Sequence, residues 1–179
     1  LLHKSDVNAM DREKRTPLHW AAGKNATDCV RLLIESGADV NCQDWSQHTP
    51  LHWAMPMDAV ESARELMKAG AQVDAVDRDR RTPLHWASEK TASKCLRQLI
   101  EPGGADVNAV DWGGYSPLHS AARCGAVSCI AILLEKGAKR ELTANNGEAA
   151  IHPAHRHPAA ALLSPSACLL YTSPSPRDC

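Results

Sequence analysis

The chain has 179 residues, with 20 Lys and Arg against 21 Asp and Glu, so its formal net charge is −1. This balance gives no reason to expect nucleic acid or an anionic membrane surface as a direct partner. No apolar run approaches the roughly 20 residues of a transmembrane helix, and no basic stretch followed by an apolar core resembles a signal peptide. The length leaves room for one ordinary domain.

Seven cysteines are spread along the chain, and none of them forms a CxxC pair. The pattern therefore gives little support to a zinc or thioredoxin-like site. The odd count and the lack of framework spacing favour reduced thiols, and so a cytoplasmic or nuclear location. We expect no cofactor and no metal.

A six-residue string recurs along the chain, as TPLHWA three times and then as SPLHSA. Its copies start at Thr16, Thr49, Thr82 and Ser116. The starts lie 33, 33 and 34 residues apart. A second string, GADVN or GAQVD, keeps the same period and starts at Gly37, Gly70 and Gly104. A fixed period of this length is typical of repeat proteins.

Each copy predicts two helices. Thr or Ser is a good N-cap, and the proline after it fits the first helical turn, where its missing N–H has no partner to lose. In the first full copy we expect a first helix over 18–24. The second helix shows helical spacing of the apolar residues Cys29, Val30, Leu32, Leu33 and Ile34. Left-handed glycines are expected to end the second helices, at Gly37, Gly70, Gly103 and Gly137.

These strings, at this period, resemble the ankyrin repeat, over residues Leu1 to about Leu163. The resemblance implies an all-α solenoid of helix-turn-helix repeats joined by β-hairpin-like loops, in which stacked neighbours bury the apolar faces. The expected organisation is a truncated remnant at 1–10, repeats at 11–43, 44–76, 77–110 and 111–143, and a degenerate or incomplete copy at 144–167. Because the pattern begins mid-repeat, we expect a fragment of a longer protein.

Residues 168–178 read CLLYTSPSPRD, which matches the translation of a DNA sequence resembling a transposase-type sequencing adapter. We interpret residues 168–179 as an artefactual, disordered tail. The alternative is a natural disordered tail rich in Ser and Pro.

The chain departs from the family pattern at two kinds of turn. The family usually has Gly between the two helices of a repeat, where this chain has Asn25, Asp58, Thr91 and Gly125. It also usually has Gly at the hairpin tip, where this chain has Lys14, Gln47, Arg80, Gly114 and Gly147. Asn and Asp tolerate left-handed backbone fairly well, but Thr does so poorly, and we expect local strain or altered turns in the first three copies. Pro56 is expected to stop its helix.

The histidines of the repeated string form a row: His19, His52, His85, His119 and His152. Neighbouring repeats are about 10 Å apart by helix packing, too far to share a zinc ion with bonds near 2.0–2.1 Å. The resemblance implies that these histidines tie neighbouring repeats through backbone hydrogen bonds. The cluster of His152, His155 and His157 is interrupted by prolines, and we expect no metal there.

Three cysteines share one position of the second helix, which favours buried packing: Cys29, Cys95 and Cys129. Trp20, Trp53 and Trp86 share a position of the first helix, and we expect them to be partly buried between repeats. The aspartates that recur before each hairpin tip are expected to form turns. Asn41 and Asn108 occupy positions that resemble substrates of an asparagine hydroxylase, although a turn role suffices.

Trp45, Trp112 and Tyr115 map to hairpin tips, where the family has variable, exposed residues. Exposed aromatic residues are frequent binding hot spots; the alternative is that each ring folds onto the neighbouring tip. The resemblance implies binding along the concave side formed by tips and first helices. On this basis the candidate partner-binding residues are Arg12, Arg15, Trp45, His48, Met57, Arg78, Arg81, Lys90, Trp112, Tyr115 and Arg123.

The sequence and the resemblance together predict a protein–protein interaction module, a scaffold or adaptor without enzymatic activity. Basic and aromatic tips alternate, which suggests a partner protein with acidic and apolar features. The alternative is a regulatory ankyrin arm of a larger enzyme, ligase adaptor or channel. No small-molecule substrate is expected. Because the first full copy lacks a preceding helix pair, we also expect apolar surface, fraying or association at that end.

Overall fold

The computed structural model describes residues 6–150. Within them the chain forms eight α-helices and one 3₁₀ helix. These are α1 (Pro17–Gly23), α2 (Thr27–Glu35), α3 (Pro50–Ala54), η1 (Met55–Met57), α4 (Val60–Lys68), α5 (Pro83–Glu89), α6 (Ser93–Ile100), α7 (Pro117–Cys124) and α8 (Val127–Glu135). The interpreted tail at 168–179 and the cluster of His152, His155 and His157 lie outside the described residues.

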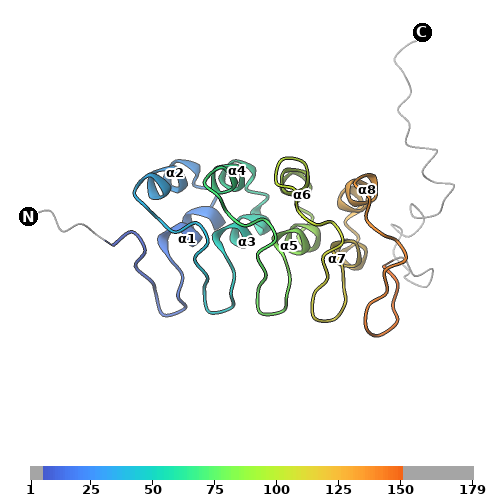
Figure 1. The fold of residues 1–179 in the computed structure, drawn as a ribbon. Coiled ribbons are helices and arrows are strands. Elements are labelled where there is room, and N and C mark those ends of the chain that lie inside the picture. Colours follow the sequence, from blue (N-terminus) through green and yellow to red (C-terminus); the bar gives the residue numbers. More distant parts are fainter. Residues whose placement is uncertain (1–5, 151–179) are drawn as a thin grey trace, which may run out of the picture.

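The helices stack as antiparallel pairs in two layers. Figure 1 shows α1, α3, α5 and α7 in one row and α2, α4, α6 and α8 in the other. Each helix packs against its own partner and against the equivalent helix of the next pair, as α1 does with α2 and α3. Long loops project from the first-helix row, side by side and on the side away from the second helices (Figure 1). The predicted all-α solenoid is confirmed.

Every first helix begins as predicted, with Thr or Ser as N-cap and Pro as the first helical residue. The histidine three residues after the cap completes each start. At the first helix, the N–H of Thr16 donates to Nδ1 of His19 at 3.1 Å, and the His19 N–H donates back to the Thr16 carbonyl at 3.0 Å. These two hydrogen bonds fix the first residue of the helix. Because Nδ1 is used in them, Nε2 is the ring nitrogen that remains available for another contact.

The chain adopts left-handed backbone at the turns where the family pattern usually has glycine. Between the helices, Asn25, Asp58 and Thr91 have φ of 52°, 49° and 58°. At the tips, Lys14, Gln47 and Arg80 have φ of 58°, 63° and 60°. The expected strain is therefore present in the first three copies, because left-handed backbone brings the Cβ of these residues close to the following carbonyl.

One glycine prediction was wrong. Gly37, Gly70 and Gly137 are left-handed, but in the third copy the left-handed residue is Gly104, with φ of 72°, and not Gly103. This copy is one residue longer than the others. The helix α6 ends at Ile100, and the loop after it turns back so that the Gly103 N–H donates to the Gln98 carbonyl at 3.2 Å. A Cβ on Gly103 would lie 2.4 Å from the Leu99 carbonyl oxygen.

Pro56 shortens its helix as expected. The α-helix α3 ends at Ala54 after five residues, and the chain continues as the 3₁₀ helix η1. This change of helix type leaves Met57 at the surface, 63% exposed, at the end of η1.

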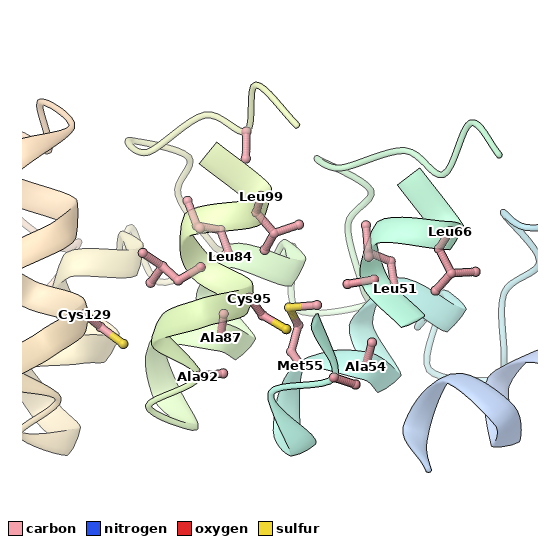
Figure 2. Close-up of a cluster of buried hydrophobic side chains, with 14 of the residues drawn as sticks. Leu51, Ala54, Met55, Leu66, Leu84, Ala87, Ala92, Cys95, Leu99 and Cys129 are labelled. Carbon is pink, nitrogen blue, oxygen red and sulfur yellow. The ribbon is translucent and has the colours of Figure 1, made fainter. Parts of the chain in front are cut away.

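The apolar core runs continuously between the two layers (Figure 2). The leucine of each repeated string is fully buried, as are four leucines of the second helices. These residues are Leu18, Leu51, Leu84, Leu118, Leu66, Leu96, Leu99 and Leu133. Burying one such side chain contributes about 1.5–3 kcal/mol, so the stacking of neighbours provides what a single helix pair lacks.

The end of the stack at α1 and α2 exposes apolar side chains, which confirms that part of the expectation. Leu32 is 62% and Trp20 43% exposed, and Cys29 is also exposed. Trp20 packs edge-on against Trp53 of the next repeat, with ring centres 5.4 Å apart, so the expected partial burial between repeats holds for Trp20 as well as for Trp53 and Trp86. Buried packing was wrong for Cys29, although Cys95 and Cys129 are fully buried. The physical reason is that this helical position faces the preceding repeat, as Ser62 shows by donating to Asn25 of that repeat.

The asparagines at the ends of the loops bridge successive repeats. The Asn41 amide donates to the Gly70 carbonyl at 3.2 Å and accepts from the Gln72 N–H at 2.8 Å. Asn108 forms the equivalent pair with Gly137 and Lys139. Both amides therefore have a structural role between successive repeats.

Candidate interaction surface

Each of the first four hairpin tips is organised by the aspartate that opens it. In the third tip, Oδ1 of Asp77 accepts from the N–H groups of Asp79 and Arg81, at 2.9 and 2.8 Å. The Asp77 N–H in turn donates to the Arg81 carbonyl at 3.0 Å. Equivalent bonds form at Asp11, Asp44 and Asp111. The predicted turn role of these aspartates is confirmed.

Backbone hydrogen bonds join each tip to the next. The N–H of Trp45 donates to the Glu13 carbonyl at 3.0 Å, and the N–H of Trp112 donates to the Asp79 carbonyl at the same distance. In the same way, the N–H of Arg78 donates to the Ser46 carbonyl, and the N–H of Asn145 donates to the Gly113 carbonyl. The tips are thus linked into a row, so side chains on them keep fixed spacings relative to one another.

Two tryptophans stand exposed on this row. Trp45 is 55% and Trp112 65% exposed, as expected from their place in the tips. Trp112 lies against the third tip, because its indole N–H donates to the Arg78 carbonyl at 3.1 Å and the Arg80 guanidinium lies 5.4 Å from its ring. The alternative of a ring folded onto the neighbouring tip therefore holds in part for Trp112, although most of its surface stays exposed. A large indole kept in water by such contacts is available to a partner.

Tyr115 behaves differently, and the alternative weighed for it holds. Its ring is half-buried and lies edge-on to His119, with ring centres 5.6 Å apart. Its hydroxyl accepts from the Asn146 amide at 2.8 Å and lies 3.4 Å from the Glu148 carboxylate. The exposure expected for Tyr115 was wrong, because the tyrosine is long enough to reach the neighbouring tip.

The basic candidates fall into two groups. Arg12 and Arg78 are exposed on the tips, where no ion pair to either is found among the described residues. Arg15 is half-buried instead: it pairs with Asp11 at 2.8 Å, and its guanidinium lies 4.7 Å from the Trp20 ring.

The remaining basic candidates gather around one carboxylate. Arg81, Lys90 and Arg123 approach the Glu89 carboxylate at 3.5, 3.2 and 3.8 Å. Arg81 also lies 3.7 Å from Asp111. Three cations around one central anion leave this part of the surface positively charged.

His48 joins two repeats through their aspartates. Its Nδ1 lies 3.2 Å from Oδ2 of Asp44 and its Nε2 lies 3.6 Å from Oδ2 of Asp77. Burial alone would lower the pKa of His48, but the carboxylates of Asp77 and Asp44 outweigh burial and raise its pKa above 6.5. The same carboxylates accept the indole N–H groups of Trp53 and Trp86, each at 3.0 Å.

A pocket of about 360 Å³ opens beside this network. Its lining comes from three repeats: Gly23, His48, His52, Trp53, Pro56, Met57 and Trp86. Gly23 makes room for the Trp53 ring, since a Cβ there would lie 3.1 Å from Cε3 of that indole. The volume is within the range of ligand sites, and we name this cavity the indole pocket.

Sequence reasoning missed the indole pocket. It placed His48 and Met57 on the binding side, but treated Trp53 and Trp86 only as residues between repeats. A signal was present at Gly23, which has no side chain at a position where the other copies have Pro56, Glu89 and Arg123.

The histidines of the repeated string act structurally. Nδ1 of His52 accepts from the Thr49 N–H at 3.1 Å, and its Nε2 faces the Arg81 carbonyl of the next repeat at 3.1 Å. A ring that accepts at Nδ1 carries its proton at Nε2, so His52 donates to that carbonyl. His19, His85 and His119 make the same two contacts. The predicted tie between neighbouring repeats is confirmed.

The comparison with known families agrees with this geometry. The model for ankyrin repeats, in three copies, matches residues 1–77 and 60–146. No curated protein shows significant similarity to the chain. In residues 6–150 no helix is long and apolar enough to cross a membrane. Ankyrin repeats are generally protein–protein interaction modules and are typically non-catalytic. The matched regions cover most of the sequence, and the chain therefore belongs to the ankyrin repeat family.

Proposed function

We propose that this chain is a scaffold or adaptor that binds a partner protein on the concave face formed by the hairpin tips and the first helices. The observation that carries the proposal is the pair of exposed indoles, Trp45 and Trp112, on a row of tips joined by backbone bonds. Rigid aromatic side chains lose little conformational entropy on binding and are frequent hot spots.

The charges on the tips support a partner with acidic as well as apolar features. Arg12 and Lys14 stand on the first tip, and Arg78 and Arg80 on the third; all four are exposed. Trp45 lies on the tip between them, and Trp112 on the tip that follows. Basic and aromatic contacts therefore alternate along the row, and an acidic segment with apolar residues matches both.

The family and the chemistry of the chain also support a non-enzymatic role in a reducing compartment. Ankyrin repeat domains are typically non-catalytic, and all cysteines of the described part are free thiols. We accordingly place the protein in the cytoplasm or nucleus, which a fluorescently tagged full chain in the source cells tests.

The proposal is tested with the double variant Trp45→Ala/Trp112→Ala. The immobilised full chain captures proteins from an extract of the source cells, and the captured set is compared by mass spectrometry. We expect the variant to lose at least one specific partner while its circular dichroism and melting temperature stay near those of the parent, because both indoles lie in water.

The matched control is Leu32→Ala/Val127→Ala, which removes two exposed apolar side chains from the second helices α2 and α8. This control is expected to keep the partners that the tip variant loses. An unchanged set of partners for the tip variant, or equal losses for both double variants, would count against binding on the concave face.

A further inference from the structure

We propose that the indole pocket is an anchoring site for one apolar side chain, leucine or phenylalanine in kind, carried by an acidic segment of the partner. The inference rests on the proposed function and adds to it the place and the chemistry of the main anchor. The pocket is lined by residues of α1, α3, η1 and α5 and by His48, which follows the tip that carries Trp45. Figure 1 shows α1, α3 and α5 in one row.

The pocket has no free polar ring atom to offer a polar occupant. Four aromatic residues line it, and they contain six ring nitrogens, two in each histidine and one in each indole. His48 faces Asp44 and Asp77 with both of its nitrogens. The remaining nitrogens, on His52, Trp53 and Trp86, are hydrogen-bonded to backbone groups or to those same carboxylates. The rings therefore present only apolar surface to a ligand. A ligand gains affinity here by burying its own apolar surface against them.

The walls of the pocket are held in place before a ligand arrives. The Trp53 indole is bonded to Asp44 and packs against Gly23, while the Trp86 indole is bonded to Asp77. His48 stands edge-on to Trp86, with ring centres 4.8 Å apart. A preformed pocket avoids part of the entropy cost of ordering side chains on binding.

The mouth of the pocket is apolar and its surroundings are basic. Met57 is 63% exposed, and Pro56 beside it is also exposed. At the position that corresponds to Met57, the preceding repeat has Lys24 and the following repeat has Lys90, both exposed. On the side of α1, the Arg15 guanidinium lies 5.9 Å from the Trp53 ring. A segment that places an apolar side chain here meets cations on both sides, which favours acidic flanking residues.

The polar groups around the pocket are already paired, which argues against a cationic occupant. Aromatic pockets also attract cations through the faces of their rings. In this pocket, however, the carboxylates of Asp44 and Asp77 are engaged by His48 and by the indole N–H groups of Trp53 and Trp86. An entering cation would therefore find no free carboxylate to pair with.

The test uses short acidic peptides and the full chain labelled with ¹³C at its methionine methyl groups. Three peptides are compared: one with a central leucine between aspartates and glutamates, one with serine in its place, and one with leucine between lysines. We expect the acidic leucine peptide to bind at least about tenfold more tightly than either of the others, and to shift the Met57 methyl signal. Equal binding of the leucine and serine peptides would overturn the proposal.

Tetramethylammonium is the probe for the cationic alternative. We expect it to leave the Met57 methyl signal and the indole N–H signals of Trp53 and Trp86 unchanged. A larger shift of these signals by tetramethylammonium than by the acidic leucine peptide would overturn the assignment in favour of a cation site.

The variant Met57→Glu places a carboxylate at the mouth without touching the core, and Met10→Glu is its control. Met10 is 57% exposed and does not line the pocket, so both variants change the same residue type and charge. We expect Met57→Glu to weaken the acidic leucine peptide at least about tenfold, and Met10→Glu less than about twofold. Equal effects of the two variants would contradict the pocket assignment.

The same variants separate this inference from the proposed function. If a partner is lost with Trp45→Ala/Trp112→Ala but kept with Met57→Glu, the concave face remains the binding surface and the indole pocket is not part of it. A partner that both the tip variant and Met57→Glu retain would count against the proposed function itself.

Discussion

The imidazole of His48 and the carboxylate of Asp77 belong to neighbouring repeats and face each other across 3.6 Å. Asp44, from the same repeat as His48, holds the other side of the ring at 3.2 Å. When protonated, the histidine connects two carboxylates that would otherwise repel each other, and through them it links the two indoles that line the pocket.

The first prediction concerns the pH dependence of this link. Three titratable groups surround His48: Asp44, Asp77 and, with ring centres 5.9 Å away, His52. The folded state binds the His48 proton more tightly than the unfolded state does. The stabilisation from His48 is therefore complete below the unfolded pKa of 6.5 and is lost as the pH rises through the raised folded pKa.

We expect His48→Gln to lower the free energy of unfolding by about 1–2 kcal/mol near pH 5.5 and by less near pH 8.5, the magnitude being that of a charge-assisted hydrogen bond. Urea denaturation of parent and variant at both pH values measures the difference. A difference that is the same at both pH values, or larger at the higher one, would show that the charge of His48 does not link the repeats.

The second prediction concerns stability in acid. Burial lowers the pKa of His52 from 6.5 to about 4, and burial also lowers the pKa of His19, His85 and His119. The unfolded state then binds protons that the folded state excludes, so the contribution of these histidines to stability is complete above pH 6.5 and falls as the pH drops towards about 4. The gap for His52 corresponds to about 3 kcal/mol.

Urea denaturation between about pH 7 and pH 4.5 measures this loss. The variant His52→Gln is expected to be less stable than the parent at neutral pH, because the bonds to Thr49 and Arg81 change, but to lose less stability on acidification. A parent whose stability stays constant over this range would refute the burial of neutral histidines.

The third prediction concerns the left-handed turns between helices. Thr91 has φ of 58°, a conformation that suits a β-branched residue poorly. We expect Thr91→Gly to raise the free energy of unfolding by about 1 kcal/mol through release of this strain. Gly125 occupies the equivalent turn with φ of 66° and provides the reverse control.

Gly125→Thr is expected to lower the free energy of unfolding by about 1–2 kcal/mol. Thermal and urea denaturation of both variants measure the sign of the change in the free energy of unfolding for each. Thr91→Gly coming out as less stable than the parent would indicate that the flexibility of glycine in the unfolded chain outweighs the strain.

The fourth prediction concerns the apolar end of the stack. Leu32 is 62% exposed on α2, and Glu65, at the equivalent position of α4, faces Arg31 of the preceding repeat at 3.9 Å. We expect this end to promote self-association of the chain, and Leu32→Arg to reduce it. Sedimentation velocity over a range of concentrations measures the change, with Val127→Arg as a control for an exposed apolar residue elsewhere on a second helix. A parent that is monomeric at every concentration would rule this out.

The sequence alone was sufficient for the features that depend on local backbone chemistry. The Thr-Pro or Ser-Pro step begins a helix in each of the four copies, and the repetition of that string at a constant period implies that the helices stack. The resemblance to the family also pointed to the left-handed turns, because Asn25 and Lys14 stand at positions where the ankyrin pattern usually has glycine. The prediction erred by one residue at Gly103, since only the hydrogen bonds of the longer loop decide which of two adjacent glycines turns.

The tertiary structure decided everything that depends on what lies beside a residue. Cys29 and Cys95 occupy the same helical position, yet within residues 6–150 only Cys95 packs against a preceding helix pair. Tyr115 is drawn onto the next tip, whereas Trp112 remains exposed. The indole pocket exists because residues of three repeats converge where Gly23 has no side chain, and no periodicity within one repeat contains that information. Local sequence sets the conformation of each unit, but the exposure of a side chain depends on its neighbours in space.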